Sequence, residues 1–116
     1  MGTLRTPESE ARYKVVVASP DFKKSCPLCE KPVTRTFTHW KLIKNEYPYD
    51  RIAEVHDMIV SKRHVTEHEL TQEEWKEFQD IKHSYIQDTY EWIFEPTHHK
   101  KSIPGHFHIH LLTVRD

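Results

Sequence analysis

Three histidines alternate with apolar residues near the end of the chain, in the run HFHIH at residues 106–110. Successive side chains of a β-strand point to opposite faces, so this spacing predicts three imidazoles in a row on one face, about 6 to 7 Å apart. Phe107, Ile109 and Leu111 would form the opposite, apolar face. A row of imidazoles adds polar groups that sheet packing does not need, so it indicates chemistry rather than a solvated sheet face.

Two kinds of chemistry suit such a row. Alternate histidines can converge as ligands on a Zn²⁺ or Fe²⁺ ion. The middle histidine, His108, can instead act as a nucleophile toward phosphorus, because an imidazole is half deprotonated near pH 6.5 and leaves well from a phosphoramidate. Both predictions hold together if the metal and the phosphate use different histidines.

The two cysteines of the chain, Cys26 and Cys29, are three residues apart. They are too few for a disulfide framework, and in a reducing compartment such a pair indicates a metal site or a redox site. The βαβ context of a thioredoxin-like redox site is missing. His64 and His68 have ligand spacing, but the 34 residues between Cys29 and His64 greatly exceed the roughly 12 to 15 of a zinc finger. Free structural cysteines are a further alternative.

Composition excludes several classes of function. The 116 residues suit one domain. Gly2 and Gly105 are the only glycines, so the chain has neither a Walker A loop nor a GxGxxG turn. With 17 Lys and Arg against 18 Asp and Glu, it lacks the basic field that attracts a nucleic-acid polymer, and no apolar run is long enough to span a membrane. We therefore expect a cytoplasmic protein with neither of these partners.

Local patterns predict the elements that position these residues. We expect a flexible N-terminal arm over residues 1–12 and a single domain over residues 13–116. Within the domain, β-branched, aromatic and alternating residues predict strands over 13–18, 34–44, 54–61 and 106–114.

One long helix is expected before the last strand. Thr71 can cap its N-terminus, and Glu74 completes a capping box. Large apolar residues recur at helical spacing from Trp75 to Ile93 and form a stripe typical of a core face. Pro96 is expected to end the helix.

The run HFHIHLL at residues 106–112 resembles the signature of the histidine triad (HIT) superfamily. Residues 56–65, HDMIVSKRHV, are similar to the other strand of that signature, with Ser61 where members usually carry Pro. The resemblance extends over about residues 26 to 112, because it also takes in Asn45, Pro48, Tyr49 and the cysteine pair.

The resemblance implies an α+β, HIT-like fold with an antiparallel sheet and one long helix. It also implies a nucleotide hydrolase or nucleotidyltransferase that acts on the α-phosphate of a nucleotide, a dinucleoside polyphosphate or a nucleoside phosphoramidate. In that family the middle histidine, here His108, forms a covalent nucleotidyl-histidine. His110 would contact the scissile phosphate, and a histidine at this third position favours hydrolysis over transfer. His56 would support the triad from behind.

Members with an early CxxC, including proteins related to galactose-1-phosphate uridylyltransferase, bind a structural zinc ion. The resemblance implies that Cys26, Cys29, His64 and His106 hold Zn²⁺ here. Such a Cys₂His₂ set is a closed tetrahedral site without an open position, which suits a structural role. A set with His68 in place of His64 stays open.

Three further positions are expected to bind substrate: Asn45, Ser102 and Gly105. Ser102 can hydrogen-bond a phosphate, and glycine lets the backbone pass close to a ligand or to the zinc ligands. Residues 98–101, HHKK, form a basic cluster that can attract phosphate. Residues 95–105 lack the glycine-rich turn and the Gln or Asn amide typical of hydrolases in the family, so the substrate's identity stays open.

Two other functions stay open. One is a catalytically weak HIT-like module that binds a nucleotide or a protein partner. The other is a metal-dependent enzyme in which the three histidines of the row are themselves the ligands. Many members of the family are dimers, so the resemblance also raises the expectation of a homodimer.

Overall fold

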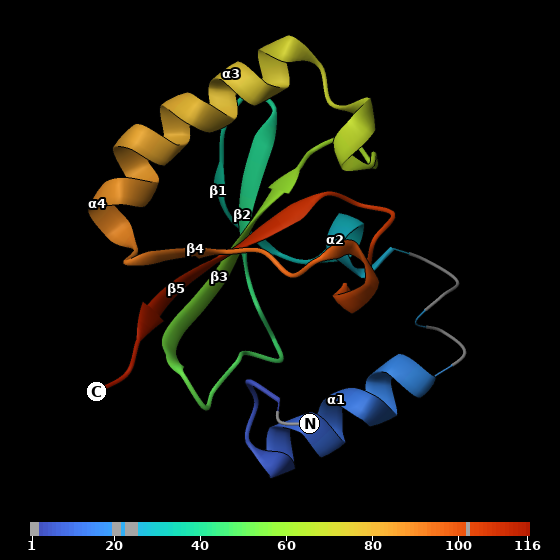
Figure 1. Ribbon diagram of the computed structural model, residues 1–116. Helices are drawn as coiled ribbons and strands as arrows, with labels where there is room; N and C mark the ends of the chain where they lie inside the picture. Colours follow the sequence, from blue (N-terminus) through green and yellow to red (C-terminus); the bar gives the residue numbers. More distant parts are fainter. Residues whose placement is uncertain (1–2, 20–21, 23–25, 102) are drawn as a thin grey trace.

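The structure is a computed structural model that describes residues 3–19, 22, 26–101 and 103–116 (Figure 1). The chain has an α+β fold in which one antiparallel sheet has the strand order β1-β2-β3-β5-β4. The strands are β1 (Val33–Thr36), β2 (Trp40–Lys44), β3 (Ala53–Ser61), β4 (Trp92–Phe94) and β5 (His108–Val114).

One long helix crosses a face of the sheet and is built from three consecutive pieces. These pieces are α3 (Gln72–Ile81), a π-helical turn (Lys82–Ile86) and α4 (Gln87–Thr89). The other helices are α1 (Pro7–Ala18) and the short α2 (Pro27–Glu30), with 3-10 turns at Glu67–Glu69 and His98–Lys100. Among the described residues, no helix is long and apolar enough to cross a membrane.

The sheet has a buried apolar cluster on each face because its strands alternate. On the face toward the long helix, Ile59, Ile109 and Leu111 pack with apolar residues of that helix. On the other face, Met58 and Val60 pack with neighbours from β2 and α2. The prediction that the apolar side of the last strand packs against the long helix is confirmed, and the histidines therefore point to the opposite face.

The start of the long helix is as predicted. Thr71 Oγ1 accepts a hydrogen bond from Glu74 N at 3.2 Å, and Glu74 Oε1 accepts one from Thr71 N at 2.9 Å. Arg63 also binds the Glu74 carboxylate, with Nη2 2.7 Å from Oε1. These contacts, the Arg63 hydrogen bond first, lower the pKa of Glu74 to about 2, although its burial opposes that shift. The capping box therefore stays charged and fixes where the helix begins.

The strand predicted over residues 13–18 is wrong, because these residues form the second half of α1. Residues 7–12, the end of the expected arm, form its first half. Thr6 accepts from Ser9 N as the N-cap, Pro7 occupies the first helical turn, and Glu8 and Glu10 add favourable acidic charge there. These start signals outweigh the strand propensity of the β-branched Val15–Val17 run.

Two element boundaries also differ from prediction. The stretch 34–44 is a hairpin of β1 and β2 rather than one strand, with Phe37 N bonded to Trp40 O at its turn. The helix ends at Thr89 instead of running to Pro96, and Trp92 and Ile93 leave the expected apolar stripe to enter β4. Aromatic and β-branched residues favour a strand, and here they cover the free edge of β5.

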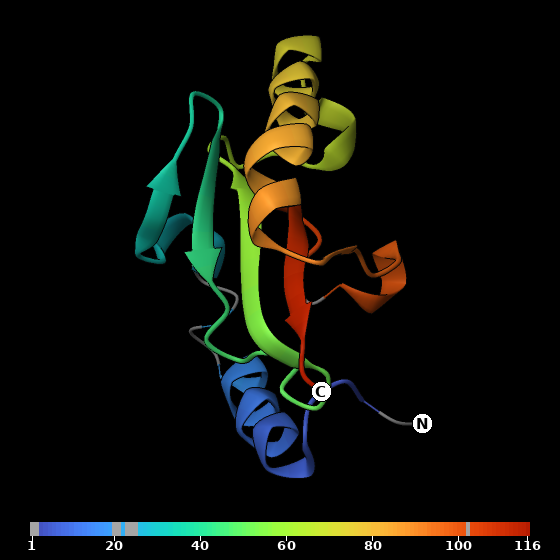
Figure 2. The same ribbon diagram turned by 90° about the vertical axis from the view of Figure 1, so that its left-hand side faces the viewer.

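The last strand begins later than predicted, at His108, and lies between β3 and β4. Val60 pairs with His108, and Met58 pairs with His110. These are central strands, so the backbone that carries the histidines is held from both sides. Helix α1 lies away from the long helix, beneath the loop between β2 and β3 (Figure 1, Figure 2).

Candidate active site and metal centre

The three histidines of the row are buried and point their ring nitrogens in different directions. His106 Nε2 lies 2.7 Å from Ser61 O, a carbonyl that can only accept. His106 therefore carries its proton on Nε2 and leaves Nδ1 as a lone pair. That Nδ1 lies 3.3 Å from Cys26 Sγ and 3.4 Å from Cys29 Sγ.

Cys26, Cys29, His64 and His106 lie close enough to hold a metal ion. Their four ligand atoms lie within 4.8 Å of one another, and His64 Nδ1 is 3.3 Å from Cys29 Sγ. Sulfur and nitrogen ligands of a tetrahedral zinc ion would be roughly 3.5 Å apart, given metal bonds of about 2.3 and 2.0 Å. The Ser61 carbonyl that accepts from His106 Nε2 is also the kind of partner that orients a metal-bound histidine.

Three separate segments supply this cluster. The cysteines lie at the ends of a tight turn at α2, in which Cys29 N bonds to Cys26 O at 3.1 Å. His64 follows β3, and His106 precedes β5. His68 lies in the 3-10 turn and does not belong to the cluster, which is the only grouping of this kind within the described residues.

His108 is held in the tautomer that leaves its outer nitrogen free. Its Nδ1 lies 2.8 Å from the His106 carbonyl oxygen, so Nδ1 carries the proton and Nε2 holds a lone pair. Burial lowers the pKa of His108 below its ordinary value. At neutral pH the ring is therefore uncharged and its Nε2 can form a bond to an electrophile.

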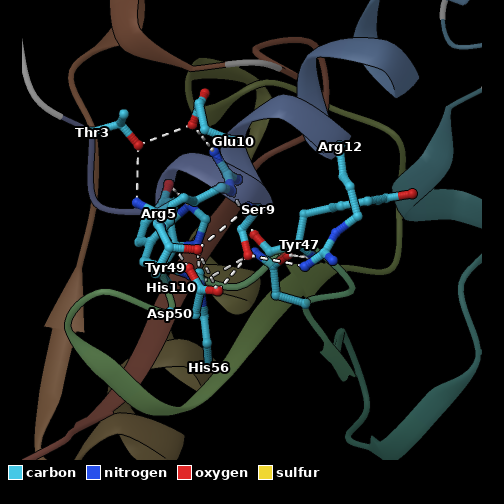
Figure 3. Close-up of polar contacts among 12 residues, drawn as sticks. Thr3, Arg5, Ser9, Glu10, Arg12, Tyr47, Tyr49, Asp50, His56 and His110 are labelled. Atoms are coloured by element: carbon cyan, nitrogen blue, oxygen red, sulfur yellow. Dashed lines mark hydrogen bonds and ion pairs between the residues drawn. The ribbon is translucent and has the colours of Figure 1, made fainter.

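His56 and His110 form a hydrogen-bonded pair (Figure 3). The His110 ring also lies beside that of His108, with ring centroids 5.3 Å apart. Tyr49 N donates to His56 Nδ1 at 3.0 Å, so His56 carries its proton on Nε2 and donates it to His110 Nδ1 at 2.7 Å. His110 Nε2–H is then left as a donor, 3.5 Å from Tyr49 Oη. Burial lowers the pKa of His56 to about 3 and that of His110 to about 2, so both rings are neutral.

A cavity of about 1100 Å³ opens onto this face of the sheet. His108 and His110 line it together with residues of the β2–β3 loop, the segment after β4 and the N-terminal segment. Its basic side chains include Lys100 and Lys101, which belong to the basic cluster predicted from sequence. The cavity therefore combines neutral imidazoles with cationic groups, which suits a phosphate ester or anhydride.

The three expected substrate-binding positions have different outcomes. Asn45 lines the cavity, with its Nδ2 3.2 Å from His56 Nε2 and its Oδ1 accepting from Tyr47 N at 2.8 Å. Ser102 lies outside the described residues. Gly105 lies beside the Cys₂His₂ cluster. A Cβ added to it would be 4.0 Å from His64 Nε2, which is an ordinary contact distance.

Sequence reasoning missed the roles of Tyr49 and Arg5 at the site. Tyr49 was noted only as part of a family resemblance, yet its backbone N–H sets the tautomer of His56. Arg5 lies in the segment expected to be a flexible arm and lines the cavity. A helix N-cap at Thr6 followed by Pro7 was the available signal that this segment is structured.

A scan of the chain against models of protein families gave no match, and a search of curated proteins found no similar one.

Proposed function

We propose that the protein is a HIT-like nucleotide hydrolase that uses His108 as its nucleophile. One observation carries the proposal: the His106 carbonyl holds the proton of His108 on Nδ1, which leaves a neutral Nε2 lone pair at the wall of a cavity. A neutral imidazole nitrogen is a good nucleophile toward phosphorus and also a good leaving group from it. Both properties are needed for a covalent intermediate that turns over.

In the proposed reaction, His108 Nε2 attacks the α-phosphorus of a nucleotide conjugate. An N–P bond forms, the bond from phosphorus to the leaving group breaks, and the leaving group departs with the bonding electron pair. The modified imidazole gains positive charge, which the His106 carbonyl stabilises through Nδ1–H. Water then attacks the phosphorus, the N–P bond breaks, and its electron pair returns to Nε2. The proton that the water loses to solvent balances the proton that the leaving group takes up from it.

His110 assists both steps as a hydrogen-bond donor in this proposal. Its Nδ1 accepts from His56, so only Nε2–H is available toward a phosphate oxygen or the leaving atom. Because both rings are neutral, the donor does not form a tight ion pair with the phosphate that would slow product release. His56 and Tyr49 act through His110 and are positioning residues.

We further propose that the Cys₂His₂ cluster binds Zn²⁺ as a structural ion. Two thiolates and two imidazoles at tetrahedral spacing are the donor set that zinc prefers, and four protein ligands leave no open position. Bound Zn²⁺ would supply a cross-link and no chemistry on the substrate. Through the bound ion, His106 would join the α2 turn to the start of β5. His106 lies two residues before His108.

Variants of two histidines test the proposed nucleophile. His108→Asn is expected to lower kcat/KM for an adenosine 5′-phosphoramidate or a dinucleoside polyphosphate by on the order of a thousandfold or more. His83→Asn, at an exposed histidine on the long helix, is the matched control and should retain activity. Retained turnover in His108→Asn contradicts the proposal. Saturable nucleotide binding by the unmodified protein without any turnover would indicate the binding module instead.

A further inference from the structure

We infer that Arg5 forms an anion subsite in the cavity, which selects substrates whose leaving group carries a carboxylate or a phosphoryl group. This inference rests on the proposed function, because it concerns the part of the substrate that departs from His108. It assigns a binding role to the N-terminal segment, whose residues line the same cavity as His108 and His110.

Helix α1 is attached at the cavity rather than built into the core. Among the described residues, neither apolar cluster of the sheet includes a residue of α1, and Val15 is 72% exposed. Its N-terminal end is hydrogen-bonded to the β2–β3 loop, beneath which the helix lies (Figure 2). A helix that adds little to the core but forms part of a cavity wall indicates a role in binding.

Asp50 fastens this segment in place (Figure 3). Its carboxylate accepts from Thr6 N at 2.8 Å, from Thr6 Oγ1 at 3.2 Å and from Ser9 Oγ. Arg51 N also donates to Leu4 O at 3.1 Å. Residues on both sides of Arg5 are therefore fixed to the loop that carries Tyr49, so Arg5 has a defined position relative to the histidines.

The Arg5 guanidinium lies between two tyrosine rings. Its Cζ is 3.8 Å from the ring centroid of Tyr13 and 4.9 Å from that of Tyr49. The Tyr49 ring centroid is in turn 5.1 Å from that of His110. One aromatic ring thus separates the cation from His110, and Arg5, His108 and His110 all line the same cavity.

The Arg5 guanidinium has Nη–H donors that its protein contacts leave unused. Nε donates to Tyr47 O at 2.8 Å, and Nη1 is 3.6 Å from Glu10 Oε2, which already accepts from Thr3 Oγ1. Neither Nη atom makes a hydrogen bond to another described residue. Its side chain is only 11% exposed, so water satisfies these donors poorly. A carboxylate or a phosphoryl group matches the fork of the guanidinium.

Two of the other lysines that line the cavity are already paired more closely, and the remaining two, Lys44 and Lys100, are exposed. Lys31 Nζ is 2.7 Å from Glu46 Oε2, and Lys101 Nζ is 3.3 Å from Glu95 Oε2. Arg5 is therefore better suited than Lys31 or Lys101 to bind an anionic substituent of the substrate.

Three nucleoside phosphoramidates that differ only in the leaving amine test this inference. The amines are glycine, aminomethylphosphonate and glycine methyl ester, which carry a carboxylate, a phosphonate and no anion. Turnover and calorimetric binding are measured for the unmodified protein, Arg5→Gln and Arg5→Lys. Arg12→Gln is the matched control, because Arg12 lies on helix α1, directly after the segment that carries Arg5, but does not line the cavity.

The unmodified protein is expected to prefer an anionic conjugate over the methyl ester by roughly 10- to 100-fold in kcat/KM, the range for one charge-assisted hydrogen-bonded contact. Arg5→Gln should abolish the preference, because turnover of the anionic conjugates falls toward that of the methyl ester, and Arg5→Lys should keep part of the preference. Arg12→Gln should keep all of it. The carboxylate and phosphonate arms show which anion the subsite prefers.

The outcomes separate this inference from the proposed function. Turnover without an Arg5-dependent preference contradicts the subsite and leaves the nucleophile intact. An Arg5-dependent preference in binding without turnover supports the subsite and contradicts the hydrolase. An equal loss for all three conjugates in Arg5→Gln means a structural role and overturns the inference, as does a failure of the unmodified protein to bind any of them.

Discussion

At the scale of single residues, the site depends on which ring nitrogen of each histidine carries the proton. Backbone groups decide this at three of the four rings: Ser61 O for His106, His106 O for His108, and Tyr49 N for His56. His110 takes its tautomer from His56. One residue type therefore serves as a metal-ligand candidate, a nucleophile candidate and a hydrogen-bond donor.

The buried neutral histidines make stability depend on pH. Burial holds the pKa of His56 at about 3 and that of His110 at about 2 in the folded chain, below the ordinary value near 6.5 that applies after unfolding. The unfolded chain therefore binds more protons below pH 6.5, and the free energy of unfolding falls as the pH drops from about 6.5 toward 3. Each histidine contributes up to about 1.4 kcal/mol per pH unit.

Urea unfolding between pH 7 and pH 5 measures this dependence. His56→Asn should reduce the slope of stability against pH, and His83→Asn, at an exposed histidine, is the matched control. An identical slope in His56→Asn and the unmodified protein would mean that His56 is not held neutral by the fold.

The sequence predicted the row on β5 because period-two alternation is local. It did not predict the tautomers, since these depend on carbonyl and amide groups that other strands and loops bring to each ring. The Tyr49 contact to His56 required the path of the loop between β2 and β3, which no local pattern specifies.

At the scale of elements, the sequence predicts a helix boundary that a capping box sets. It does not predict a boundary that depends on pairing with a strand far along the chain. The start of α3 followed from Thr71 and Glu74. The end of the helix did not, because Trp92–Phe94 pairs with a strand that follows later in the chain. Helix α1 shows the opposite case. Its valines favour a strand, but its N-terminal cap at Thr6 decides the local structure.

Metal removal tests how the α2 turn is tied to β5. We expect Cys29→Ser to lose about one zinc per chain and to lower the free energy of unfolding by about 4 kcal/mol or more, as loss of a structural ion does. Metal analysis and thermal unfolding measure the two effects. His68→Asn is the control and should keep its zinc, because His68 lies outside the cluster. Zinc retained in Cys29→Ser, or lost in His68→Asn, would contradict the assigned ligands.

At the scale of the whole molecule, the sheet separates the larger apolar cluster from the candidate site. The face covered by the long helix holds the larger apolar cluster, and the opposite face carries the metal cluster, the histidines and the cavity. Residues of helix α1, which lies outside the sheet (Figure 1), line that cavity. The sequence indicated both faces of β5, but it could not show that the N-terminal segment returns to the site, because that return depends on contacts between Asp50 and a distant helix cap.

The central claim is that His108 becomes covalently bonded to the α-phosphorus of a nucleotide. The most direct measurement is rapid acid-free quenching of the protein with a nucleoside phosphoramidate, followed by mass spectrometry of the intact chain and its peptides. We predict a mass increase of one nucleoside monophosphate residue, located on His108 and missing from His108→Asn. An adduct on another residue would contradict the covalent role of His108. So would turnover without any adduct in samples quenched within one catalytic cycle.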